Sequence, residues 1–311
     1  MIHPAVKNWP LAKRKNALKQ RASILQKIRQ FFHGRGFLEV ETPYRIPAPA
    51  PESHIDPMPS GQWFLHPSPE LCMKRMLAAG FEKIFQICHC WREGERGSLH
   101  IPEFTLLEWY RVGVDYMELM EECEALIQAL ALGLEIGDFL TYRGHQIFLG
   151  SPWERMTVED AYRRYSGIST KEAFQQDLFD EVMVREIEPR LGTERPTFLY
   201  DYPSERRSLA RLKKEDPSVA ERFELYLGGL EIANGFSELI DPEEQRKVFQ
   251  WEMEVRQSMG KKMYPMPEKF LDELQTMPPS AGIALGVDRL VMVFLNAERI
   301  DEVVAFTPEE L

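Results

Sequence analysis

The residues best suited to chemistry gather in one segment, residues 85–110, around a single polar loop. Arg92 ends a strand-like run and is suited to a bidentate contact with a phosphate or a carboxylate. His100 adds a second donor from the loop, and Phe104 offers a flat face for a base at the start of the next run. This set indicates a site for a phosphate-bearing ligand. The alternative at this point is a surface hairpin with ordinary charges.

Two further features point to a ligand. Glu108 and Tyr110 are two residues apart in a strand-like run, so their side chains lie on the same side of a sheet. A run of small residues at 281–285 turns through Gly286 into a helix whose first turn holds Arg289. A cation there is unfavourable for the helix dipole, which indicates that Arg289 serves a ligand rather than the helix. A simple surface arginine is the alternative.

Acidic residues and an amide lie close together between residues 224 and 238. Glu224 and Glu231 stand on two strand-like runs, on either side of a glycine pair. Clustered carboxylates beside a phosphate site are what Mg²⁺ requires, because it takes hard oxygen ligands and bridges phosphates. Exposed acids on an edge strand are the alternative, which the apolar neighbours of these residues disfavour.

The four cysteines, Cys72, Cys88, Cys90 and Cys123, suit a reducing compartment better than a disulfide framework. Cys88 and Cys90 share one face of a strand-like run. Their single-residue spacing does not fit a zinc knuckle, which separates its cysteines by two to four residues. The spacing alone therefore favours buried structural thiols.

Hydrophobic periodicity predicts helices at 11–35, 69–79, 116–132, 242–259 and 287–296. Strands are predicted at 37–43, 83–91, 103–112, 197–200, 221–239 and 281–285. Residues 44–60 are expected to form a loop, and residues 133–195 to be mostly helical with a short strand near 146–149. Strands paired by hairpins, with helices before and after them, indicate an antiparallel sheet in an α+β domain.

Charge is unevenly distributed along the 311 residues. The net charge is −11, which argues against a general nucleic-acid binder. The first 36 residues nevertheless hold nine Lys/Arg and no acid, which fits either a solvated helix face or a basic patch for an anionic partner. No run of 18 apolar residues and no signal-peptide pattern is present, so we expect a cytoplasmic protein without a membrane span.

Taken together, these segments resemble the three signature motifs of class II aminoacyl-tRNA synthetases of the lysyl type. The resemblance extends from about residue 13 to residue 307, with motif 1 at about 24–43, motif 2 at about 85–111 and motif 3 at about 281–296. It implies one catalytic domain over residues 1–311, without an anticodon-binding domain, and a homodimer built through motif 1. Within this group the sequence is most similar to the truncated paralogue that modifies elongation factor P.

Four features favour the paralogue. The length leaves no room for an anticodon-reading fold before motif 1, and Trp109 stands where lysyl-tRNA synthetases usually lack a tryptophan. Ser68 and Ala284 replace the alanine and glycine that are usual in those synthetases. In the family these two changes accompany a preference for (R)-β-lysine over lysine. Stable binding to tRNA is therefore not expected.

The resemblance also implies a function for each matching residue. Glu70 is expected to hold the substrate amino group near the reacting end. The side-chain ammonium is expected to be bound by Glu108, Tyr110 and Glu238. The pocket around the substrate is expected to be formed by Ser68, Asn234, Phe236, Gly282 and Ala284. Contacts to ATP are expected from Arg92, Glu93, His100, Phe104, Glu224 and Arg289, with Arg92, His100 and Arg289 catalytic, and Mg²⁺ is expected on Glu224 and Glu231.

The sequence departs from the family's usual motif 2 at two positions. Gly94 replaces part of an Arg-Asn-Glu pattern, so Glu93 or Glu95 is expected to take over the contact with adenine. Leu99 stands where an arginine is common, and Arg96 is expected to supply that charge.

The resemblance implies adenylation of lysine or (R)-β-lysine and transfer to a lysine of elongation factor P. The other hypotheses are a truncated lysyl-tRNA synthetase acting on tRNA and an inactive synthetase-like regulator. The basic residues of helix 11–35 are expected to lie near the path of the acceptor.

Overall fold

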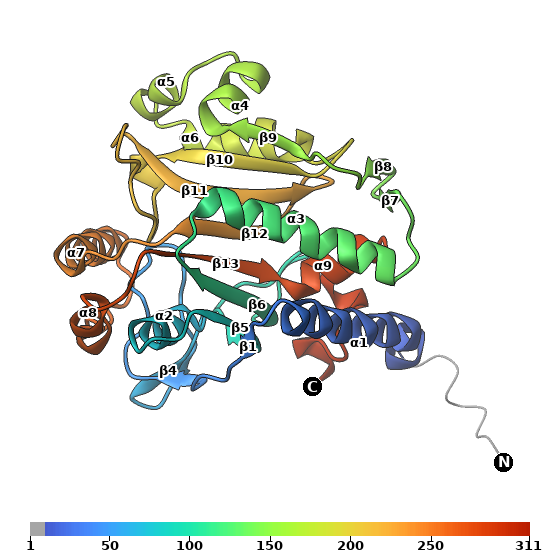
Figure 1. Cartoon of the computed structure of the whole chain (residues 1–311), viewed down its shortest axis with the longest axis horizontal. Helices are drawn as coiled ribbons and strands as arrows, with labels where there is room; N and C mark the ends of the chain where they lie inside the picture. Colours follow the sequence, from blue (N-terminus) through green and yellow to red (C-terminus); the bar gives the residue numbers. More distant parts are fainter. Residues whose placement is uncertain (1–9) are drawn as a thin grey trace.

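An eight-stranded sheet forms the centre of the computed structural model, which describes residues 10–311 (Figure 1). Its strands, in spatial order, are β1 (Leu38–Glu39), β5 (Lys83–Trp91), β6 (Glu103–Val112), β13 (Ser280–Gly286), β12 (Leu230–Ser237), β11 (Val219–Leu227), β10 (Thr197–Pro203) and β9 (Glu154–Thr157). The strands from β5 to β10 pair antiparallel. The two edge strands, β1 and β9, run parallel to their neighbours. The expected α+β fold with a largely antiparallel sheet is confirmed.

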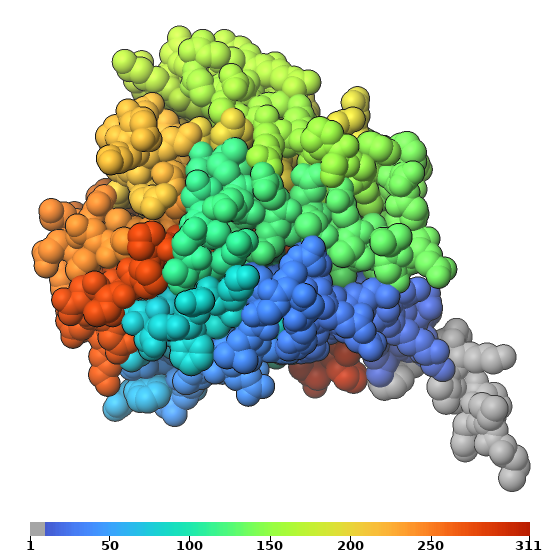
Figure 2. Space-filling view, in the orientation of Figure 1, coloured from blue at the N-terminus to red at the C-terminus, as the bar shows by residue number. Residues whose placement is uncertain are grey.

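Three helices cover one face of this sheet. They are α1 (Pro10–Gly34), α3 (Tyr116–Gly133) and α9 (Val287–Phe294). Figure 2 shows α1 and α3 side by side on this surface. Helix α1 buries Ile24, Ile28, Phe31 and Phe32, a spacing that places them on one stripe. Helix α3 begins at Asp115, whose carboxylate accepts hydrogen bonds from the first-turn amides.

A second layer packs on the other face, because alternate residues of a strand point to opposite sides. It contains α2 (Glu70–Ala78), α7 (Pro242–Ser258) and α8 (Glu268–Leu274). Trp109 packs toward α1 and α3, whereas its neighbour Tyr110 belongs to this second layer. Helices α4 (Val158–Tyr165), α5 (Thr170–Gln175) and α6 (Phe179–Val182) form a separate cluster beside β9 and β10.

The short elements are where the structure differs from the sequence predictions. Residues 133–195 contain the strands β7 (Phe139–Tyr142), β8 (His145–Phe148) and β9, not one short strand. The predicted loop at 44–60 contains β2 (Arg45–Ile46) and β3 (Pro59–Ser60), which pair with β4 (Trp63–Leu65). Strands of two to four residues are too short to show a period. No helix within residues 10–311 is long and apolar enough to cross a membrane.

Candidate active site

A cavity of about 420 Å³ opens on the face of the sheet opposite α1 and α3. Alternate residues of β6, β11, β12 and β13 point into it, because the strand period is two. The predicted residues that line this cavity come from distant parts of the sequence, between residues 68 and 289. The predicted residues that line it are Ser68, Glu70, Arg92, His100, Phe104, Glu108, Tyr110, Glu224, Glu231, Asn234, Phe236, Gly282, Ala284 and Arg289.

Two predicted residues do not line this cavity. Glu238 is fully buried directly behind Gly282. Glu93 is exposed, and its amide donates to the Asp56 carbonyl instead. Glu95 lines the cavity in its place. Of the two glutamates considered from the sequence, the structure favours Glu95 as the one near a nucleotide.

One end of the cavity carries the cationic and aromatic groups. The Arg92 guanidinium lies 5.0 Å from the centre of the Phe104 ring. Within the described part of the chain, the buried Nε of Arg92 has no hydrogen-bond partner, so this donor is available to a ligand. The Arg289 Nη2 atom lies 2.5 Å from His100 Nε2. Burial, and then the positive charge of Arg289, lower the pKa of His100, which favours the neutral ring.

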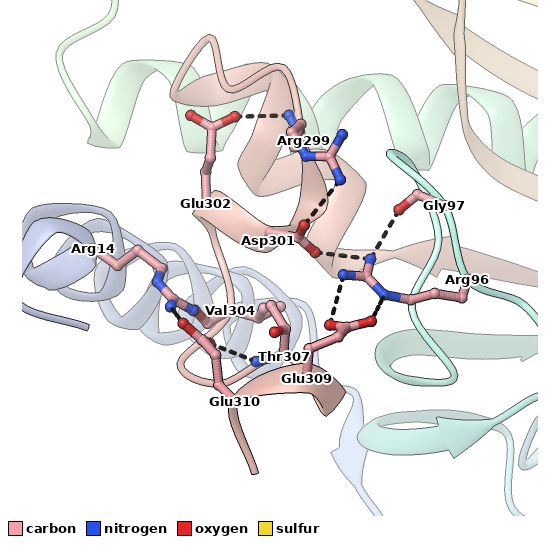
Figure 3. Close-up of polar contacts among 10 residues, drawn as sticks. All are labelled: Arg14, Arg96, Gly97, Arg299, Asp301, Glu302, Val304, Thr307, Glu309 and Glu310. Atoms are coloured by element: carbon pink, nitrogen blue, oxygen red, sulfur yellow. Dashed lines mark hydrogen bonds and ion pairs between the residues drawn. The ribbon is translucent and has the colours of Figure 1, made fainter. Parts of the chain in front are cut away.

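The loop that carries His100 is held from outside by the C-terminal segment (Figure 3). The Arg96 guanidinium bonds to both carboxylate oxygens of Glu309, at 2.9 and 3.0 Å. It also lies 2.9 Å from Asp301, and the Ile300 amide donates to the Ser98 carbonyl. Arg96 is thus held by the C-terminal segment and is not among the residues that line the cavity, and the expectation that it supplies a charge to the ligand stays a prediction.

A group of acids lies beside the cationic end. Glu224 accepts hydrogen bonds from Arg222 and Tyr226. Glu231 lies 3.3 Å from Arg289. Burial, followed by repulsion from Glu224 and Glu231, raises the pKa of Glu188 to about 7. Oxygen ligands of this kind, with the electrostatic repulsion among them, suit a hard divalent cation.

The other end of the cavity is a buried acid held by two hydroxyl groups. Ser68 Oγ donates to Glu108 Oε1 at 2.6 Å, and the Tyr110 hydroxyl donates to Oε2 at 2.8 Å. Burial, followed by repulsion from Glu70, raises the pKa of Glu108 to about 8. A carboxylate in this state is suited to bind a cation that replaces its proton.

Lys74 lies between two more carboxylates at the same end. Its ammonium is 2.5 Å from Glu70 and 2.5 Å from Glu238, and its side chain is fully buried. Burial opposes the charged ammonium, but the two carboxylates outweigh it and raise the pKa of Lys74. We therefore take Lys74 as protonated, although burial also raises the pKa of Glu238 to about 8. Glu70 and Glu238 share this one internal cation, and Glu108 has only hydroxyl partners, so the pocket has room for positive charge on a ligand.

Gly282 is required by the close packing of these groups. A Cβ atom at this position would lie 2.2 Å from the Tyr110 ring and 2.6 Å from Glu238 Oε1. Any side chain would thus displace both residues. Because Gly282 has no side chain, Tyr110 and Glu238 can both pack closely against it.

A loop above the cavity adds an acid that the sequence did not indicate. Burial raises the pKa of Glu52 to about 7. Its carbonyl accepts from Arg256 Nη1 at 2.7 Å. Arg256 is fully buried and also binds Asp56, so α7 fixes the loop over the cavity.

The residues that sequence patterns missed are Glu52, Lys74, Glu188 and Arg222. For Lys74 the only signal was its position four residues after Glu70, which is also typical of a surface ion pair. Arg222 lies two residues before Glu224 on β11, and this spacing places the two side chains on the same face of the strand. Glu188 and Glu52 lie outside long periodic segments and gave no signal.

The sheet, the hairpin with Arg92, and the strand-to-helix turn with Arg289 define a class II aminoacyl-tRNA synthetase catalytic unit. The family model described as tRNA synthetases class II (D, K and N) matches residues 8–310. The elongation factor P–(R)-β-lysine ligase of Proteus mirabilis (strain HI4320) is 40% identical, over 97% of this chain and 98% of the relative. The ligase of the same name from Edwardsiella ictaluri (strain 93-146) is also 40% identical, over 96% and 97%.

The chain therefore belongs to the class II tRNA synthetase family, in the branch of the elongation factor P–(R)-β-lysine ligases. A similar ligase from Salmonella arizonae (strain ATCC BAA-731 / CDC346-86 / RSK2980) is 40% identical over 96% of both chains. The resemblance inferred from the motifs is confirmed.

Proposed function

We propose that this chain activates (R)-β-lysine or lysine with ATP and transfers it to a lysine ε-amino group of elongation factor P. The observation that carries the proposal is one cavity with cationic and aromatic groups at one end and buried acids at the other. When Glu70, Glu108 and Glu238 are all ionised, they exceed the charge of Lys74 by two, which matches a doubly positive amino acid. An analogue without an ammonium would leave buried acids unpaired, which gives the selectivity.

We assign the substrate contacts by position in the cavity. Glu70 is placed to bind the amino group near the reacting carboxylate, and Glu108 with Tyr110 to bind the distal ammonium. Glu238 supports this end of the cavity through its ion pair with Lys74 and its close packing against Gly282. The pocket is completed by Ser68, Asn234, Phe236 and Ala284.

ATP is assigned to the cationic end. Following the family resemblance, Phe104 and Arg289 would stack on either side of the adenine, Arg92 would bind the α-phosphate and His100 the γ-phosphate. Glu95 replaces Glu93 as the proposed adenine contact. Glu224 and Glu231, with Glu188 beside them, would hold Mg²⁺, which would neutralise phosphate charge.

The first step joins the amino acid to AMP. A carboxylate oxygen of the amino acid attacks the α-phosphorus, the bond to the bridging oxygen breaks, and pyrophosphate leaves. No protein nucleophile is required, because positioning and charge stabilisation by Arg92 and Arg289 supply the catalysis.

The second step transfers the aminoacyl group. The acceptor amine attacks the carbonyl carbon of the mixed anhydride, and AMP leaves with the electrons of the broken C–O bond. The amine loses a proton and an amide forms.

The activation step is tested by pyrophosphate exchange. We expect (R)-β-lysine, and less efficiently lysine, to drive exchange of labelled pyrophosphate into ATP. Arg92→Ala is expected to lower the rate by a factor on the order of 100 or more, since it removes charge stabilisation of the α-phosphate. Lys247→Ala on α7 is a surface control that is expected to leave exchange unchanged. If neither (R)-β-lysine nor lysine drives exchange, the proposed adenylation is refuted.

The acceptor is tested separately with ATP, labelled amino acid and either elongation factor P or tRNA. Label on elongation factor P alone supports the proposal. Label on tRNA alone would favour the truncated synthetase, and a protein that binds ATP without exchange would be the inactive regulator.

We further propose that the chain forms a homodimer through motif 1 and acts in the cytoplasm, where a translation factor is found. Leu38, Tyr44 and Trp63, in and around this motif, are each about half exposed, at 51%, 47% and 45%. Exposed apolar groups of this size favour an interface. Sedimentation of the full chain tests the dimer, and a monomer at all concentrations would contradict it.

A further inference from the structure

Three side chains that commonly bind soft metals meet beside Phe104 and Leu106, two residues that line the cavity: His66, Cys88 and Cys90. His66 directly follows β4, and the two cysteines lie two residues apart on β5. The Cys88 and Cys90 sulfurs are 3.9 Å apart, and Cys90 Sγ lies 3.9 Å from His66 Nε2. Across residues 10–311, no other three His, Cys, Asp or Glu side chains bring ligand atoms within 4.8 Å of one another.

These separations are close to the edges of a metal coordination sphere. Tetrahedral Zn²⁺ bonds at about 2.3 Å to sulfur and about 2.0–2.1 Å to nitrogen place S and S about 3.8 Å apart and S and N about 3.5 Å apart. The sulfurs of Cys88 and Cys90, which are 3.9 Å apart, already have the S-to-S spacing of such a site. The nitrogen of His66 needs to move by only a few tenths of an ångström toward Cys90 to reach the S-to-N spacing, and all three ligand atoms already lie within 4.8 Å of one another.

The surroundings of the cluster also favour a bound cation. His66, Cys88 and Cys90 are 1%, 3% and 0% exposed, and the cysteines pack against Leu106. Two thiolates and a divalent cation together carry no net charge, which an apolar surrounding tolerates better than a separate ion.

The protonation of His66 must change when a metal binds. Its Nε2 now contacts the His89 carbonyl oxygen at 2.8 Å, a contact that requires the proton on Nε2. A metal would replace this proton, which would move to Nδ1.

We propose that His66, Cys88 and Cys90 bind one soft d¹⁰ cation, Zn²⁺ or Cu⁺, as a structural site that joins the end of β4 to β5. Thiolate and imidazole ligands select such cations over the hard Mg²⁺. The single-residue spacing of the cysteines favoured plain structural thiols. The third ligand, which lies 22 residues before Cys88 in the sequence, changes that interpretation.

Cobalt substitution tests the site without an activity assay. The full chain is freed of metal under reducing, anaerobic conditions and titrated with Co²⁺. We expect one equivalent to bind, with thiolate-to-cobalt charge-transfer absorption and the visible bands of a tetrahedral site, and we expect Zn²⁺ to displace it. Competition of Cu⁺ with a colorimetric chelator distinguishes the two cations.

Matched alanine variants locate the ligands. Cys90→Ala is expected to abolish the charge-transfer band and to weaken Zn²⁺ binding by more than the roughly 10–100-fold that loss of an outer-shell partner costs. Cys123→Ala removes another fully buried thiol, on α3. This variant is expected to leave the charge-transfer band and the Zn²⁺ affinity unchanged. Circular dichroism of each variant establishes that it is folded.

Two results would overturn the proposal. One is binding of both Zn²⁺ and Cu⁺ weaker than about 10 μM by the wild-type chain. The other is an equal charge-transfer band in a folded Cys90→Ala variant, which would place the metal elsewhere.

Discussion

If Glu108 binds the distal ammonium as proposed, binding of the amino acid depends on pH. Burial and the charge of Glu70 raise its pKa to about 8, so in the empty pocket it is mostly protonated at pH 7. An ammonium group of the ligand requires the ionised carboxylate. The empty protein thus holds a proton that the complex has released, and affinity rises with pH up to the raised pKa.

We predict that the KM for the amino acid falls as the pH rises from 6 to 8, by up to about 50-fold if Glu108 alone controls binding. Pyrophosphate exchange at several pH values measures this change. Calorimetry in buffers of different ionisation enthalpy measures the released proton, which we expect to be close to one at pH 7. A KM that is constant from pH 6 to 8, with no proton released, would contradict the role of Glu108.

Ser68 provides a variant that shifts this pH profile. Its hydrogen bond to Glu108 stabilises the ionised form and lowers the pKa of that carboxyl group. In Ser68→Ala the profile should therefore move to higher pH. Ser166→Ala, at the end of α4, is the control and should leave it in place.

At the scale of elements, the loop between β5 and β6 depends on the C-terminal segment (Figure 3). Arg96 joins this loop to Glu309 and Asp301. The same segment is tied to α1 by the ion pair between Arg14 and Glu310. Ordering the loop before ATP binds lowers the entropic cost of placing His100 at the phosphates.

We predict that Glu309→Gln raises the KM for ATP roughly two- to five-fold, with a smaller change in kcat, because exposed ion pairs contribute little each. The effect should shrink in high salt. In the wild-type chain the pKa of Glu309 is lowered to about 2, chiefly by the hydrogen bond from Arg96. The pair therefore persists above about pH 4 and weakens only as the pH falls toward the lowered pKa.

Arg14→Gln is the matched control for this contact. It removes the ion pair on the α1 side of the segment and leaves the Arg96 contacts in place. If Arg14→Gln raises the KM for ATP as much as Glu309→Gln does, general fraying of the C-terminus is the cause. An unchanged KM in Glu309→Gln would show that the loop is ordered without this contact.

Long elements could be predicted from the sequence, and short ones could not. β5 and β6 begin and end at the predicted residues, because nine or ten alternating positions specify a strand and its face. Two-residue strands such as β2 depend on β4, which lies many residues away, and their sequence carries no period of its own.

The same difference applies to the candidate site. Residues in the three motifs were found because their types and spacing form a specific combination. Lys74 was missed because a lysine four residues after a glutamate reads the same on a surface helix as in a buried pocket. Only the packing of α2 against Glu238, which directly follows β12, distinguishes the two, and the sequence does not specify that contact locally.

At the scale of the molecule, the charge is divided between a basic helix and an acidic remainder. The residues before position 37 carry nine positive charges, so the rest of the chain is near −20, given the net charge of −11. The structure divides the basic residues further. Arg14, Arg21 and Arg29 are paired with acids of this chain, and Lys7 lies outside the described residues. Lys13, Lys15 and Lys19 are exposed on α1.

These three lysines lie in the first part of α1, together with Arg14. The start of α1 contacts the C-terminal segment through Arg14, and that segment contacts the loop through Arg96. An acceptor protein that approaches the phosphate end of the cavity would therefore pass close to α1. Opposite charge at such a rim speeds association more than it strengthens the bound complex.

We predict that the triple variant Lys13→Glu, Lys15→Glu, Lys19→Glu slows transfer to elongation factor P by roughly tenfold at low ionic strength. Pyrophosphate exchange should be unchanged, because these lysines do not reach the cavity. Arg14 is left intact so that the C-terminal segment stays in place. Lys171→Glu on α5 is a charge-reversal control far from α1 in the fold (Figure 1). Equal slowing of exchange and transfer would assign the effect to folding, and unchanged transfer would exclude α1 from the path of the acceptor.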